Sequence, residues 1–82
     1  MVIFLDGQHQ IIRMEELFSG TLNTSAVYPR EVIQKVLEYE AVSVILVHNH
    51  PSGSLTPSSS DRAVTRKLQT ALTAIDVEVL DH

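Results

Sequence analysis

Four residues between positions 47 and 61 have the side chains best suited to chemistry in this sequence. They are His48, His50, Ser58 and Asp61, and their spacing is His-x-His-x7-Ser-x2-Asp. Two imidazoles and a carboxylate form a ligand set that zinc accepts, and catalytic zinc usually has three protein ligands with water in the fourth position. The spacing therefore predicts a catalytic zinc site with an open position.

The segments on either side of these residues can bring the ligands together. Residues 42–47 form an apolar run typical of a buried strand, and this run leads directly into His48. Because side chains alternate along a strand, His48 and His50 should project from the same face of its end. A loop rich in proline, serine and glycine follows, and it can return Asp61, at the start of the next amphipathic segment, toward the imidazoles.

Each of these residues also has a structural interpretation. The two histidines could form ordinary hydrogen bonds at the end of a strand. Ser58, followed three residues later by Asp61, is close to a capping box, in which the serine caps a helix and the acid reaches back to the backbone. The two interpretations are compatible, because an aspartate in a first helical turn can both favour the helix dipole and bind a metal.

Composition limits the class of protein. Eighty-two residues make one domain, and a domain near this size buries only about 60% of the surface of its unfolded chain. Cysteine is absent, which excludes disulfides, thiolate metal sites and the paired cysteines of zinc deaminases. The formal net charge of -4 disfavours direct binding of nucleic acid through its phosphates. Without a signal peptide or a membrane-length apolar run, we expect a soluble, cytoplasmic domain with no membrane contact.

Hydrophobic periodicity and turn residues predict seven elements in the order βββαβαβ. The expected strands are 2–5, a segment around 11–12, 21–27, 42–47 and 77–80. Pro29 suits the first position of a helix that should run to Tyr39 or Glu40. The expected apolar stripes of the two helices are Val32, Ile33, Val36 and Leu37, and Val64, Leu68, Ala71, Leu72 and Ile75. This order indicates an α+β fold, a mixed β-sheet packed with two helices, in a single domain over residues 1–82.

The sequence resembles a known family in several places. The His-x-His-x7-Ser-x2-Asp spacing is that of the JAMM metalloprotease motif of MPN/JAB domains. Four segments resemble the bacterial RadC family: His-Asn-His-Pro-Ser-Gly at 48–53, Tyr-Pro-Arg-Glu at 28–31, Glu-Glu-Leu-Phe-Ser-Gly-Thr-Leu at 15–22, and Val-Leu-Asp-His at 79–82. Together these matches extend over nearly the whole chain.

The resemblance implies a JAB1/MPN (cytidine-deaminase-like) architecture and a role for each motif residue. His48, His50 and Asp61 would hold Zn²⁺, Ser58 would steady an oxyanion, and a glutamate would accept a proton from the zinc-bound water. In the family this glutamate precedes the first strand, which would place it upstream of Met1, and we expect a domain truncated at both ends. Glu15 and Glu16 are the nearest alternatives for the base, and their simpler interpretation is as solvated charges at a strand end.

Several functions are open at this point. The first is a zinc-dependent, metallopeptidase-like hydrolase that cleaves peptide or isopeptide bonds of a protein substrate through a zinc-activated water. The second is a weakly active or inactive metal-binding module in DNA repair or protein interaction, which a missing glutamate favours, and the third is a structural domain without metal. Unpaired edges of a truncated sheet also predict a symmetric homodimer. The basic residues Arg62, Arg66 and Lys67 are interpreted as a solvated helix face.

Overall fold

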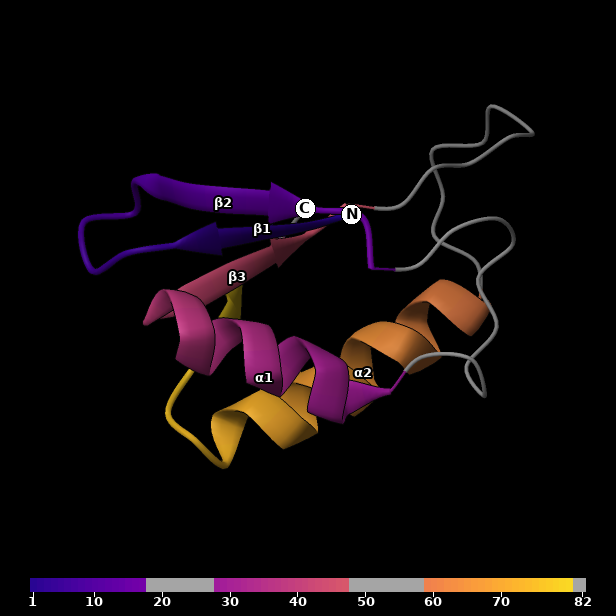
Figure 1. Ribbon diagram of the computed structural model, residues 1–82. Helices are drawn as coiled ribbons and strands as arrows, with labels where there is room; N and C mark the ends of the chain where they lie inside the picture. Colours follow the sequence, from indigo (N-terminus) through magenta and orange to yellow (C-terminus); the bar gives the residue numbers. More distant parts are fainter. Residues whose placement is uncertain (18–27, 48–58, 81–82) are drawn as a thin grey trace.

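The structure is a computed structural model that describes residues 1–17, 28–47 and 59–80, with residues 59–61 described by their backbone alone. Two helices cover one face of a four-stranded sheet (Figure 1). The elements along the chain are β1 (Val2–Leu5), β2 (Ile11–Glu15), α1 (Pro29–Tyr39), β3 (Ser43–Leu46), α2 (Ser59–Thr73) and β4 (Glu78–Leu80). The strand expected at 21–27 lies outside the described residues. Neither α1 nor α2 is long and apolar enough to cross a membrane.

The sheet has the strand order β2-β1-β3-β4. β1 pairs antiparallel with both β2 and β3, whereas β3 and β4 are parallel and joined through α2. Asp6 closes the β1–β2 hairpin, because its Oδ1 accepts hydrogen bonds from the backbone amides of Gln8 (2.8 Å) and Gln10 (2.9 Å). A mixed sheet with two helices on it confirms the predicted α+β class.

The core lies between the sheet and the helices. Its side chains are at most 2% exposed and come from alternate strand positions and from helix positions four apart: Val2, Phe4, Val44, Leu46, Val32, Val36, Val64, Leu68 and Leu72. The helical members were predicted by periodicity. The prediction was wrong for two other residues of these stripes. Leu37 on α1 is 66% exposed, and Ile75, which is 36% exposed, lies beyond the end of α2.

Four of the elements have one of their ends at the same end of the molecule. β2 and β3 both end there, and α1 and α2 both begin there (Figure 1). The register places Glu15, Val2 and Leu46 in one row across β2, β1 and β3 at this end. β3, which precedes residues 48–58, therefore ends at the same end of the molecule at which α2, which follows them, begins.

Candidate metal centre

Buried side chains fix the two elements that flank the JAMM residues. β3 lies in the interior of the sheet between β1 and β4, and its Val44 and Leu46 are fully or almost fully buried against the helices. α2 is fixed to the same core by Val64, Leu68 and Leu72. The elements before and after residues 48–58 are thus both fixed to the same core.

The predicted ligands lie close in the chain to these two elements. His48, His50 and Ser58 lie outside the described residues, and Asp61, whose backbone alone is described, is the third residue of α2. Two imidazoles and one carboxylate are a donor set that suits zinc. Within the described ranges, no three His, Asp or Glu side chains are grouped so as to hold a metal ion. The described part of the fold therefore offers no competing metal site.

Glu15, considered above as an alternative base, ends β2 and faces α1. Its carboxylate lies 3.8 Å from Nζ of Lys35, and its Oε2 is buried without a hydrogen-bond partner among the described atoms. Nζ of Lys35 also lies 3.5 Å from the Glu38 carboxylate. Because Glu15, and to a smaller extent Glu38, stabilise the charged ammonium, the pKa of Lys35 is raised above its ordinary 10.5.

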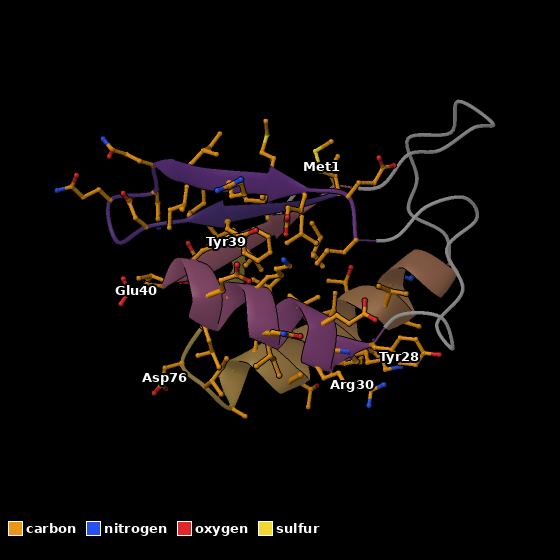
Figure 2. All side chains as sticks on the ribbon, viewed as in Figure 1. Met1, Tyr28, Arg30, Tyr39, Glu40 and Asp76 are labelled. Atoms are coloured by element: carbon orange, nitrogen blue, oxygen red, sulfur yellow. The ribbon has the colours of Figure 1, made fainter. Side chains whose placement is uncertain are left out.

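Tyr39 joins this ion pair to the core, in the space between α1 and the sheet (Figure 2). Its ring packs edge-on against Phe4, with centroids 5.2 Å apart and an interplanar angle of 73°. Cζ of Arg13 and Nζ of Lys35 lie 5.3 Å and 5.7 Å from the centroid of the Tyr39 ring. Desolvation is the largest cause that raises the pKa of Tyr39, and the nearby Glu15 carboxylate raises it further. We refer to Arg13, Glu15, Lys35 and Tyr39 as the Glu15 cluster.

The Glu15 cluster was not predicted from the sequence. Arg13 and Glu15 are two residues apart on one face of β2, and Lys35 and Tyr39 are four apart on one face of α1. Both spacings are visible in the sequence, but the packing of that strand face against that helix face is not. Glu15 has a defined partner in Lys35, whereas Glu16 is exposed. The role of either residue as a base stays a prediction.

Comparison with known proteins decides the family. A family model described as RadC-like JAB domain matches residues 1–82. The chain belongs to the RadC-like JAB domain family. This confirms the resemblance inferred from the motifs, and the α+β fold with its mixed sheet is compatible with a JAB domain. The roles of His48, His50, Ser58 and Asp61 stay predictions.

Curated relatives of this RadC-like JAB domain are longer proteins. The UPF0758 proteins of Delftia acidovorans and Polaromonas sp. are 56% and 57% identical to it over 81 residues. A UPF0758 protein of Haemophilus influenzae is 54% identical over 82 residues. These alignments cover 99% or 100% of this chain but only 36% or 37% of the relatives. The chain thus spans little more than a third of their length.

Proposed function

We propose that this RadC-like JAB domain is the metal-binding part of a zinc-dependent hydrolase that cleaves peptide or isopeptide bonds. The observation that supports this function is where the residues of the JAMM motif lie in the chain. They begin just after the end of β3 and finish in the first turn of α2. Both elements are fixed by buried side chains, as a preorganised site requires. Membership of the RadC-like JAB family supports the same function.

The chain's own residues have distinct roles in this proposal. His48, His50 and Asp61 are the ligands, and the helix dipole favours the charged, ligating form of Asp61 in the first turn of α2. When bound, zinc supplies Lewis acidity and lowers the pKa of a bound water to about 7. The Ser58 hydroxyl donates a hydrogen bond to the carbonyl oxygen of the substrate as negative charge develops on it.

A hydrolase also needs a group that accepts the proton of the attacking water, which is typically worth about 10²–10⁴-fold in rate. Among the described side chains we propose Glu15, because it ends β2 in the same row as Leu46, at the end of the sheet from which the ligand segment departs. Its Oε2 lies 3.8 Å from Nζ of Lys35, and this ion pair competes with the attacking water for the carboxylate. We therefore expect slow hydrolysis by these 82 residues.

Metal analysis of the purified protein tests the ligand assignment. We expect one zinc per wild-type chain and a large loss of zinc in His50→Ala. His9→Asn is the matched control: it removes an imidazole from the β1–β2 hairpin, and His9 has a φ of 60° that asparagine tolerates. Full zinc content in His50→Ala would contradict the assignment, and an equal loss in His9→Asn would show that binding is non-specific.

A second proposal is a metal-binding module that acts in protein interaction or DNA repair without hydrolysis. The Glu15–Lys35 ion pair favours it, because it occupies the carboxylate proposed above as the base. Cleavage of an unstructured protein and of an isopeptide-linked substrate separates the two proposals. Zinc-dependent cleavage above the His50→Ala background supports the hydrolase. Stoichiometric zinc without such cleavage supports the module.

A further inference from the structure

The face of the sheet that points away from the helices has an apolar row across all four strands. The register places Met14, Ile3, Ile45 and Leu80 side by side on β2, β1, β3 and β4. Each of these residues is next in the chain to a position that faces α1 and α2, and successive strand side chains point to opposite faces. The row therefore lies on the face that neither described helix covers.

Two further residues extend this row at the end of the sheet. The backbones of Met1 and Val47 pair through hydrogen bonds of 3.0 Å and 2.9 Å, which continue the β1–β3 ladder. The Met1 side chain projects away from α1 and α2 (Figure 2). Met14, Met1 and Val47 are 54%, 44% and 39% exposed. We call Met1, Ile3, Met14, Ile45, Val47 and Leu80 the apolar face.

Charge is confined to the margins of the apolar face. None of its six side chains is charged, and the carboxylates of Glu16 and Glu78 lie two residues along the chain from Met14 and Leu80. Both carboxylates belong to exposed residues. A contiguous apolar surface of uncharged side chains with a polar rim is characteristic of an interface.

We propose that the apolar face is the contact surface between two copies of this chain. A second copy fits because a two-fold axis through the face sets apolar residues against apolar residues and leaves Glu16 and Glu78 at the solvated rim. The two sheets would pack about 10 Å apart with the helices outside. Four strands spaced about 4.8 Å apart make a narrow face. Two copies packed through it would bury on the order of 1,000 Å² of accessible surface in total, which is the lower limit for a specific interface. The dimer is therefore weak and depends on protein concentration.

Sedimentation equilibrium of the wild-type chain from about 10 to 500 µM tests this contact. We expect a monomer–dimer equilibrium, strengthened by added salt because the rim carboxylates repel one another. Met14→Glu should raise the dissociation constant by about tenfold or more, since it buries a carboxylate in the contact. Leu37→Glu, with the same charge on the exposed outer side of α1, should leave the constant unchanged. A monomer throughout the range, or equal effects of the two variants, would overturn the proposal.

Cross-linking separates this contact from pairing through the edge strands. The chain has no cysteine, so Ile45→Cys introduces a single thiol on an interior strand. Face-to-face packing brings two such thiols within about 10 Å, whereas pairing along β2 or β4 keeps them at least three strand spacings, about 14 Å, apart. We expect a short bifunctional thiol reagent to link Ile45→Cys into dimers and to leave Leu37→Cys monomeric. If Ile45→Cys is not cross-linked at concentrations where sedimentation shows dimers, the contact lies at an edge strand and the proposed contact through the apolar face is wrong.

Discussion

At the scale of single residues, the Glu15 cluster determines how the end of β2 is held against α1. A carboxylate oxygen that is removed from water without a hydrogen bond is unfavourable, and the nearby Lys35 ammonium offsets that cost. The Tyr39 ring lies beside the pair, with its centroid 5.7 Å from Nζ of Lys35, and packs edge-on against Phe4. Lys35, which stabilises the Glu15 carboxylate, thus also competes with water for it.

Glu15→Gln separates the structural and chemical roles of this residue. If Glu15 accepts the proton, zinc-dependent hydrolysis should fall by about 10²-fold or more while zinc content stays constant. The folded state should also lose a little stability, because Lys35 then retains only Glu38 as a partner. Glu16→Gln, at an exposed position beside it, is the control. Unchanged hydrolysis in Glu15→Gln would exclude Glu15 as the base.

The pKa shifts of Lys35 and Tyr39 predict a loss of stability in alkaline solution. Both pKa values are raised in the folded state, from 10.5 and 10.0, so the folded chain retains these protons to higher pH than the unfolded chain. Their stabilising contribution is present below the unfolded pKa values and is lost as the pH rises through the folded ones. Urea unfolding at several alkaline pH values should show this fall, and Lys35→Met should make it shallower. Equal slopes for the two proteins would contradict the Lys35 contribution.

At the scale of secondary structure, both helices end in the same way. Glu40 after α1 and Asp76 after α2 have left-handed φ angles of 54° and 60°, and both are labelled in Figure 2. The amides of the next residues, Ala41 and Val77, donate to carbonyls in the last helical turn at 3.0 Å and 2.9 Å. Ala41 and Val77 are themselves buried. This is the Schellman arrangement, formed here with acidic residues where glycine is usual.

Glycine at the left-handed position should therefore stabilise the chain. We expect Glu40→Gly to raise the free energy of unfolding by about 0.5–1 kcal/mol, because glycine adopts this φ without steric cost. Glu38→Gly, inside α1, should lower it by about 1 kcal/mol, since glycine is a poor helix former. Urea unfolding followed by circular dichroism measures both. A loss of stability in Glu40→Gly would mean that the Glu40 side chain stabilises the fold by more than its left-handed φ destabilises it.

The helix ends also show what the sequence could and could not predict. Pro29 marked the start of α1 correctly, because its fixed φ and missing amide suit only the first turn. No glycine marks the end of α2, so the apolar Ile75 was wrongly included in that helix. The JAMM residues could be recognised because they are close together in the chain. The Glu15 cluster could not, because it joins a strand to a helix through tertiary packing.

At the scale of the whole molecule, stability depends on one layer contact between the sheet and two helices. A chain of this size is typically stable by about 4–12 kcal/mol, so a single core side chain accounts for a large share of it. Ligand binding to the folded state adds to this, and zinc at 100 times its dissociation constant would contribute about 2.7 kcal/mol. Folding and metal binding should therefore be coupled through α2, which contributes both core residues and Asp61.

Leu68→Ala tests this coupling. Leu68 is fully buried near the middle of α2, and its truncation should lower the free energy of unfolding by about 2–5 kcal/mol. Because α2 also positions Asp61, zinc affinity should fall in the same variant, and excess zinc should restore part of the lost stability. Leu37→Ala, which truncates a leucine that is 66% exposed, should change stability by no more than about 0.5 kcal/mol and leave zinc affinity unaltered. Urea unfolding with and without zinc, together with a zinc titration, measures both quantities. If Leu68→Ala lost stability but kept the wild-type zinc affinity, the metal ligands would be positioned independently of the packing of α2.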